Sequence, residues 1–203
     1  MMKKENKAEK VEMQNLLDKH DATRMVLTVL SSSVSIDSEI LLAYLNLLVA
    51  LLEGGNNKVQ KTIFNYFQTF SRSEVIFAKF HSIIASQTSK QNRASKEQIL
   101  ENLLESGASE LVILEKTLRV LQLFTEGHYL DLQNYIRDQT NSRNNYDLVS
   151  AVVDLLRSYL NNLSQANYEN IMGCLDTLAE FVQVRQTIST ENLINMYYLG
   201  SLS

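Results

Sequence analysis

The chain contains no proline in 203 residues, and this absence constrains its fold more than any other feature. Proline is the strongest helix breaker, because it lacks a backbone N–H and its ring clashes with the preceding turn. Only six glycines remain as strong local interruptions. Helices are therefore permitted almost everywhere, and the pattern of apolar residues decides where they form.

Apolar residues recur with the period of a helix through most of the chain. Residues 35–53 show the pattern clearly, with glycines at 54 and 55 in C-cap position and Asn56 placed to cap the next helix. A capping-box pattern at 71–74 precedes a further helix. The expected helices run over residues 35–53, 56–70, 71–84, 97–125, 129–139, 146–160, 171–182 and 190–199.

Glycines and polar segments mark the breaks between these helices. Gly107 is expected to break or kink the longest one, and Gly127 to end it. Residues 86–96 and 140–145 are polar and are predicted to be loops. The last two apolar rows are expected to face the core: Tyr146, Val149, Val153, Leu156 and Leu160, then Ile171, Leu175, Leu178 and Val182.

The fold class predicted from this pattern is all-α, with seven to nine helices. Short connections favour antiparallel stacking of neighbours, and no sequence repeat is evident. An irregular α-solenoid and a helical bundle both remain open on pattern alone. Residues 1–10 are charged and are expected to be disordered, while residues 11–203 should form one helical domain that the 86–96 loop could subdivide.

Composition excludes several classes of protein. The net charge of -4 argues against a general nucleic-acid binder. A single cysteine, Cys174, excludes an internal disulfide framework and a cysteine-rich zinc site. The first ten residues do not resemble a signal peptide, and the longest apolar stretch, residues 40–52, is shorter than the roughly 20 residues of a membrane span. We therefore expect a soluble chain that does not insert into a membrane.

Catalytic patterns are not found in the sequence. It has no glycine-rich phosphate loop, no nucleophile elbow and no zinc-protease motif. Cys174 lies in a helical pattern and is expected to be a small core residue, and His20 and His81 are isolated. The sequence predicts neither an enzyme nor an organic cofactor.

Three segments carry a resemblance to a known family. They are LVALLEGGNNKVQKTIF at 48–64; LRVLQLFTEGH, LQNYIRDQ and YDLVSAVVDLL within 118–156; and, more weakly, LDTLAEFVQ at 175–183. Together they resemble the RIH-associated domain of the inositol-trisphosphate and ryanodine receptor family, the intracellular calcium-release channels. The sequence departs from that pattern at Thr125, where the family has cysteine, and at Tyr129, where it has asparagine. Residues 184–186 replace a G-P-C loop, and the family's long insertion between the first two blocks is short here.

The resemblance implies a fold and a site. It implies an armadillo-like solenoid, and it implies that Glu126 and Glu180 bind an activating Ca²⁺, with His128 and Gln183 close behind them. From the residues alone, these glutamates are solvated carboxylates or salt-bridge partners. Because Ca²⁺ takes 6–8 oxygen ligands and two carboxylates supply at most four, we expect a partial site with weak binding. In the family a backbone carbonyl from beyond the pore adds a ligand.

The resemblance also implies a role. In the family this region couples cytosolic ligand-sensing domains to the membrane pore of a homotetramer, on the cytosolic face of the endoplasmic reticulum or a related calcium store. The expected partners are other domains of the same channel. The alternative is a stand-alone helical scaffold that has lost the channel. For the segment 132–139 the residues leave two interpretations, a docking surface or an internal set of hydrogen bonds, and the second is favoured.

Overall fold

The computed structural model describes residues 2–70, 72–93, 107–139 and 142–182, and this part of the chain consists of helices and their connections. It contains no strand, so the predicted all-α class is confirmed. The helices are α1 (Met2–Lys19), α2 (Ala22–Leu30), α3 (Ser38–Leu52), α4 (Asn57–Thr69), α5 (Glu74–Arg93), α7 (Gly107–Thr125), α8 (Leu130–Arg137), α9 (Leu148–Asn161), the short 3₁₀ helix η1 (Gln165–Asn167) and α10 (Tyr168–Val182).

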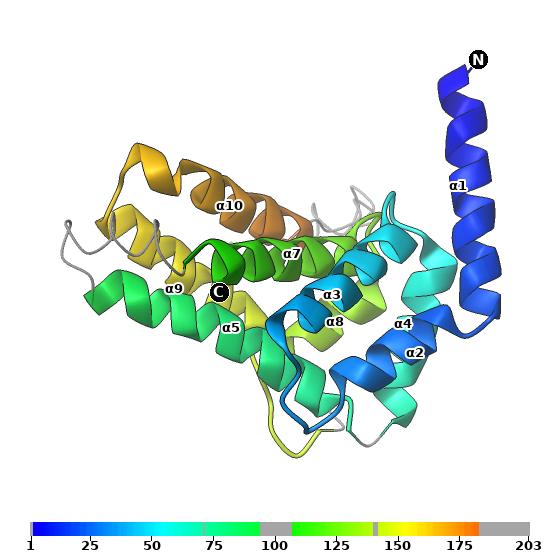
Figure 1. Cartoon of the computed structure of the whole chain (residues 1–203), viewed down its shortest axis with the longest axis horizontal. Helices are drawn as coiled ribbons and strands as arrows, with labels where there is room; N and C mark the ends of the chain where they lie inside the picture. The colour runs from blue at the N-terminus through cyan, green and yellow to red at the C-terminus, as the bar shows by residue number, and fades with distance from the viewer. Residues whose placement is uncertain (1, 71, 94–106, 140–141, 183–203) are drawn as a thin grey trace, which may run out of the picture.

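Helix α7 lies at the centre of the stack, between α3 on one side and α10 on the other (Figure 1). Six consecutive residues near its end, 120–125, are all buried. A helix that is covered on every side in this way belongs to the core rather than to the surface. Helices α5, α9 and α10 complete one side of the molecule, while α1 to α4 lie on the other, with α1 projecting from the body (Figure 1).

An aromatic cluster fills the space between α4, α5, α7 and α8. The ring of Phe67 stacks on Tyr135 with centroids 5.7 Å apart, and it meets Phe77 and Phe124 edge-on at 5.0 and 5.8 Å. Aromatic pairs at these distances add to the burial of their large surfaces. The cluster joins α4 and α5 to α7 and α8.

The predicted helix ends are largely confirmed. Asn56 caps α4 by accepting from the Lys58 amide, and Asp37 and Asp147 cap α3 and α9 in the same manner. Gly54, Gly55 and Gly127 all have positive φ, the left-handed conformation expected after a helix end. Residues 142–145 of the predicted loop are irregular, and α9 begins at residue 148, two residues later than predicted.

The predicted loop at 86–96 is wrong over residues 86–93, which continue α5. Two glutamines of this segment, Gln87 and Gln91, are buried against α9, and the Asn162 side chain donates to the Gln91 carbonyl. The segment is polar in composition but still presents an inner face to α9. The possible subdivision of the domain at this place stays a prediction, and residues 94–96 lie outside the described part.

A further expectation differs from the structure. Residues 2–10, expected to be disordered, belong to α1. The described part of the longest predicted helix begins at Gly107 as α7. The expected residues 97–106 of that helix, on which the predicted break or kink at Gly107 depends, lie outside the described residues, as does the expected helix at 190–199. A two-residue turn connects α1 to α2, and α2 was missed in the sequence.

The buried faces of the last two helices differ in part from the predicted ones, although Ile171 of the predicted row in α10 is buried. In α9 the buried row is Leu148, Val152, Leu155 and Tyr159, one residue before the predicted row. In α10, Leu175 and Val182 are 44% and 59% exposed, although both were expected in the core. Helix α9 packs between α5 and α10. The side of α9 that these neighbours cover therefore differs from the side that the spacing of its apolar residues indicated.

None of the helices in the described part is both long enough and apolar enough to cross a bilayer.

Candidate functional site

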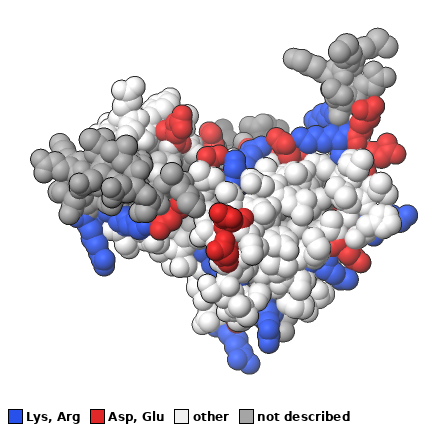
Figure 2. Space-filling model, viewed as in Figure 1, with Lys and Arg blue, Asp and Glu red and all other residues white. Residues whose placement is uncertain are grey.

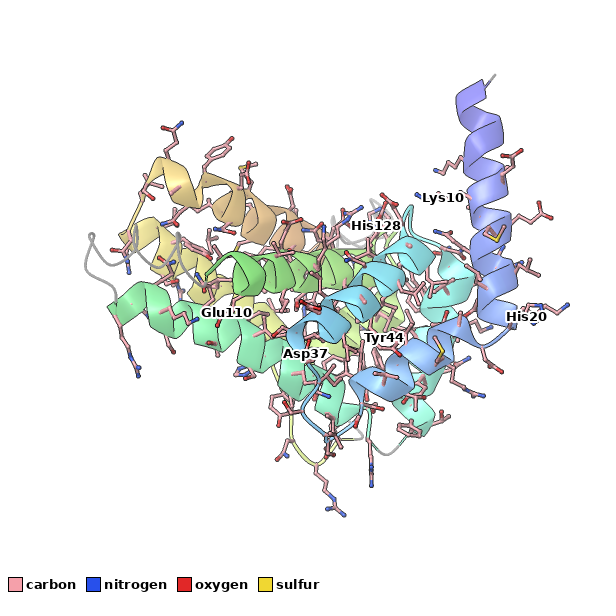
Figure 3. All side chains as sticks on the ribbon, in the orientation of Figure 1. Lys10, His20, Asp37, Tyr44, Glu110 and His128 are labelled. Carbon is pink, nitrogen blue, oxygen red and sulfur yellow. The ribbon has the colours of Figure 1, made fainter. Side chains whose placement is uncertain are left out.

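The first candidate ligand, Glu126, follows the last residue of α7. Its amide donates to the Gln122 carbonyl, which continues the helical pattern by one residue. Gly127 and His128 then both take the left-handed conformation, with φ of 76° and 64°. The chain therefore turns away sharply after the glutamate, and Figure 3 shows His128 at this end of α7, beside the turn between α3 and α4.

Gln60 on α4 fixes the end of α7 through two main-chain carbonyls. Its Nε2 donates to the Leu123 oxygen at 2.9 Å and to the Glu126 oxygen at 2.8 Å. The side chain is fully buried. The last carbonyls of a helix lack partners within the helix, and Gln60 supplies two of them with a donor.

The turn after α3 packs directly on the same glutamate. A Cβ added to Gly55 would lie 3.2 Å from the Glu126 carbonyl oxygen and 3.3 Å from its Cγ. The φ of Gly55 is 69°, so both the conformation and the close approach require glycine. Gly54 beside it has φ of 89° and open space around the position of a Cβ.

The second candidate ligand, Glu180, lies on α10, which runs parallel to α7. A Cβ on Gly173 would face Leu118 at 3.7 Å. One turn further along both helices, the Gln122 side chain donates to Thr177 Oγ1 at 3.0 Å. The next turn brings the end of α7 at Glu126 to the part of α10 that contains Glu180. We call this region the glutamate end, comprising Gln60, Glu126, Gln133, Arg137 and Glu180.

Helix α8 holds α10 at the glutamate end. Gln133 donates to the Glu180 carbonyl at 3.1 Å, and Arg137 donates to the Phe181 carbonyl at 3.1 Å. Tyr135 of the same helix donates to the Phe67 carbonyl at 3.2 Å. Gln139 donates to the Tyr135 carbonyl and accepts from the Tyr146 amide. The internal interpretation of segment 132–139 is therefore confirmed for these side chains, whereas Asn134 is exposed.

The glutamates of this end are only partly buried. The Oε2 atom of Glu126 and the Nδ1 atom of His128 are themselves buried, and neither has a hydrogen-bond partner among the described residues. An unpartnered carboxylate oxygen is suited to a hard cation such as Ca²⁺. Within the described residues, however, no group of three or more His, Cys, Asp or Glu side chains gathers to hold a metal. Glu126 thus offers one buried, unpartnered oxygen that a cation could bind, and Gln183 lies outside the described part.

The other residues considered in the sequence have structural environments. Cys174 is fully buried, and burial raises the pKa of its thiol to about 12, which suits the predicted core role and makes it inert. His81 lies beside the Tyr146 ring with centroids 5.7 Å apart. His20 is an exposed residue of the turn between α1 and α2.

Sequence reasoning missed the residue that positions the end of α7. Gln60 lies between Val59 and Ile63 on the apolar face of α4, and it is buried although it is polar. A polar residue inside an apolar row is a signal for a buried hydrogen bond, because burial without one is costly. The partner could not be named from the sequence, because Leu123 and Glu126 are more than 60 residues away.

The fold and the glutamate end define an all-helical module in which the ends of two parallel helices, α7 and α10, are fixed by glutamine and arginine side chains. Residues 108–199 match the family model described as RyR and IP3R Homology associated. The matched segment begins at the second residue of α7 and continues beyond α10. The resemblance seen in the sequence is confirmed there.

Proposed function

We propose that the chain is a cytosolic regulatory module of an intracellular calcium-release channel, in which Glu126 and Glu180 supply carboxylate oxygens to a Ca²⁺ site. The observation that carries the proposal is the parallel register of α7 and α10, since it brings the two glutamates to the same end of the molecule. The buried, unpartnered Oε2 of Glu126 supports it. The remaining oxygens would come from outside the described residues.

The residues of the glutamate end have definable roles in such a site. Gln60 holds the main chain at Glu126, and Gln133 holds it at Glu180, so neither ligand has to be ordered when the cation binds. A bound Ca²⁺ would neutralise carboxylate charge and join the ends of α7 and α10 to a neighbouring segment. A ligand shifts a conformational equilibrium only by its differential affinity for the two states. Ca²⁺ binding would therefore be coupled to a conformational change of the channel if the neighbouring segment reaches the site in only one of two conformations.

The proposed setting follows the family. The partners would be other domains of the same channel, assembled as a homotetramer at the cytosolic face of a calcium-store membrane. We further propose a binding role rather than an enzymatic one, with no nucleic-acid partner. The glutamate end offers carboxylates whose main chain is fixed by Gln60 and Gln133, and oxygen ligands of this kind suit a hard cation.

Calorimetric titration of the 203-residue chain with Ca²⁺, and separately with Mg²⁺, tests the proposal. We expect weak Ca²⁺ binding, with a dissociation constant of about 10⁻⁴ to 10⁻³ M, as for poorly enclosed sites. Binding should be lost in Glu126→Gln and in Glu180→Gln. Glu115→Gln is the matched control, because that side chain is an exposed carboxylate of α7 that is 66% accessible. Tight binding that survives Glu126→Ala would refute the assignment, and so would equal losses in the Glu115 control.

A stand-alone helical scaffold is the second candidate, and one observation favours it. Helix α10 presents a row of apolar side chains outward, which is typical of a surface for protein contacts. The neighbouring coding sequence separates the two candidates: membrane spans and a pore loop in frame would identify a channel.

A further inference from the structure

The outer face of α10 carries a regular row of exposed apolar residues. Tyr168, Met172, Leu175 and Val182 are 61%, 37%, 44% and 59% exposed, and Ala179 is exposed between the last two. Their spacing is four, three, four and three residues, which is the seam of a helix that packs along another helix. At 1.5 Å per residue the row is about 21 Å long. We call it the α10 stripe.

The stripe is an outer surface of the folded chain rather than a misplaced core. The opposite side of α10 is already occupied, since Cys174, Thr177 and Phe181 are buried against α7 and α9. Single exposed apolar residues are common and need no explanation, whereas a continuous row marks a contact surface. Figure 2 shows mainly uncharged surface over α10, with acidic side chains among it.

The charge beside the stripe indicates what covers it. Glu169 and Asp176 are exposed and lie seven residues apart, so they fall two turns apart on the same side of the stripe. Neither forms an ion pair with another described residue. Helix α10 contains no lysine or arginine. The apolar stripe is therefore bordered by uncompensated negative charge.

We propose that the α10 stripe is the docking surface of an amphipathic helix that lies outside this chain and carries lysine or arginine beside its own apolar row. Opposite charges beside an apolar seam select the partner and its orientation. This proposal goes beyond the calcium site and does not depend on it. If the glutamate end did not bind Ca²⁺, the α10 stripe would still be an exposed apolar surface suited to a partner helix.

The same charges argue against three other occupants. A second copy of α10 packed antiparallel would bring the acidic borders with Glu169 and Asp176 against each other, which is repulsive, and in neither orientation does α10 supply a basic residue to meet them. An anionic membrane surface attracts helices with basic borders, not acidic ones. Residues 183–203 contain one arginine and one glutamate, so they do not supply a basic row.

A pair of synthetic peptides tests the proposal against the full-length chain. Both peptides are about 18 residues long, enough to span the stripe, with leucines at alternating spacings of four and three. One has lysines on both borders of the leucine row, and its twin has glutamates at the same positions. Fluorescence anisotropy of the labelled peptides gives the two affinities. We expect the lysine peptide to bind at least about tenfold more tightly than its twin.

Three variants make the test specific. Leu175→Ser should weaken the lysine peptide by about tenfold or more, because it removes a central apolar contact. The double variant Glu169→Lys and Asp176→Lys should reverse the preference between the peptides. Met13→Ser, at another exposed apolar residue on α1, should change neither affinity. Circular dichroism confirms that each variant is folded.

Several outcomes would overturn the proposal. They are an unreversed peptide preference in the double lysine variant, or equal effects of Leu175→Ser and Met13→Ser. Sedimentation velocity that shows a dimer lost in Leu175→Ser would assign the stripe to a second copy instead. Co-sedimentation with phosphatidylserine vesicles that is lost in the same variant would assign it to a membrane surface.

Discussion

Helix α4 packs against α1 on one side and against α7 and α8 on the other, and the two contacts are built differently. The contact with α1 also includes the end of α3, and we call it the α1 junction. It joins Lys10, Gln14, Asn15 and Asp18 of α1 to Ala50 of α3, to Glu53 and Asn56 in the turn after it, and to Thr62 of α4. The contact with α7 and α8 is made by Gln60 and the aromatic cluster around Phe67. The first contact is polar and the second is mainly apolar.

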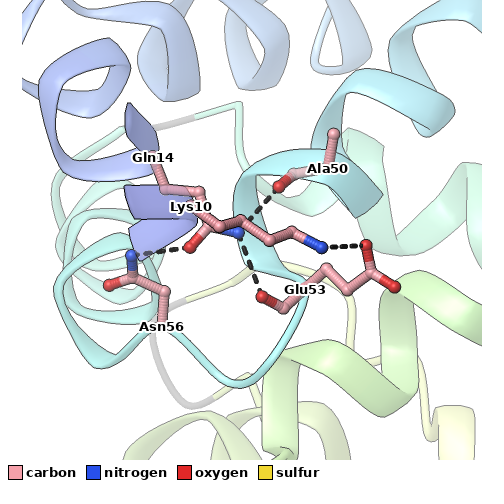
Figure 4. A network of polar contacts seen from close by, with 5 residues as sticks. All are labelled: Lys10, Gln14, Ala50, Glu53 and Asn56. Carbon is pink, nitrogen blue, oxygen red and sulfur yellow. Dashed lines mark hydrogen bonds and ion pairs between the residues drawn. The ribbon is translucent and has the colours of Figure 1, made fainter. Parts of the chain in front are cut away.

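The α1 junction is a network of hydrogen bonds with one exposed ion pair (Figure 4). Gln14 donates to the carbonyls of Ala50 and Glu53 at 2.8 and 3.0 Å, and Asn56 donates to the Gln14 oxygen at 3.0 Å. Lys10 and Glu53 form an ion pair of 2.6 Å with both side chains 47% exposed. Gln14 is the only buried residue among residues 7–19 of α1.

The difference between the contacts indicates how each behaves under stress. A hydrogen bond contributes only about 0.5–1.5 kcal/mol net, because water replaces it when the contact opens. Burial of a large aromatic side chain contributes more and has no such replacement. Helix α1 should therefore detach by local opening, whereas the glutamate end should persist until the domain unfolds.

The largest effect is expected at the aromatic cluster. Phe67→Ala should lower the free energy of unfolding by about 3–5 kcal/mol, because it leaves a cavity between three other rings. Chemical denaturation measures this value. Phe70→Ala is the control at the C-cap residue that follows α4, since its side chain is 38% exposed and its removal should cost much less. Equal costs would contradict the placement of the core on this face of α4.

The second prediction compares the two glutamines directly. Gln60→Ala leaves the Leu123 and Glu126 carbonyls without their donor in the interior, so the loss should be about 1–3 kcal/mol. Gln14→Ala also removes a donor from two carbonyls, but water reaches them once α1 moves away, and about 1 kcal/mol or less is expected. Denaturation of both variants checks the difference. Similar losses would remove the distinction between the junctions.

The third prediction separates steric contact from backbone conformation at the turn after α3. Gly55→Ala should destabilise the chain by about 1–3 kcal/mol, since its φ is positive and the new Cβ would crowd Glu126. Gly54 also has a positive φ, but a Cβ there would contact nothing. Gly54→Ala should therefore lower the free energy of unfolding by only about 1 kcal/mol. Thermal melts compare the variants. If Gly54→Ala costs as much, the close approach to Glu126 contributes nothing.

The smallest effect is expected at the exposed ion pair of the α1 junction. The hydrogen bond from Lys10, and then its charge, hold the pKa of Glu53 below its ordinary value of 4.5. The contribution to stability is therefore present above pH 4.5 and is lost as the pH falls through the lower folded pKa. Because the pair is exposed, we expect at most about 0.5 kcal/mol, weakened by salt. Hydrogen exchange of the α1 amides between pH 3 and pH 6, in wild type and in Glu53→Gln, measures this contribution to the stability of α1. If the variant keeps the pH dependence of the wild type, another group causes it.

Much of the local structure could be predicted from the sequence. Asn56 identified the start of α4, and Gly54, Gly55 and Gly127 identified the ends of α3 and α7, because capping and left-handed turns depend on residues close in the chain. The glutamates were found through a family resemblance and not through any local signal. Their juxtaposition depends on the register of α7 and α10, which are separated by about fifty residues.

The sequence by itself determined that this chain is helical and where most of its helices end. It also indicated that the longest apolar rows belong to the core. Only the tertiary structure decided which face of α9 and α10 is covered, that residues 86–93 are helical, and that Gln60 reaches the end of α7. The physical reason is the range of the interactions. Helix propensity and capping act within a few residues, whereas burial depends on which distant helix is the neighbour. The neighbours of α10 are α7 and α9, and they cover only one side of it. Leu175 and Val182, whose spacing predicts a core position, therefore lie on the surface.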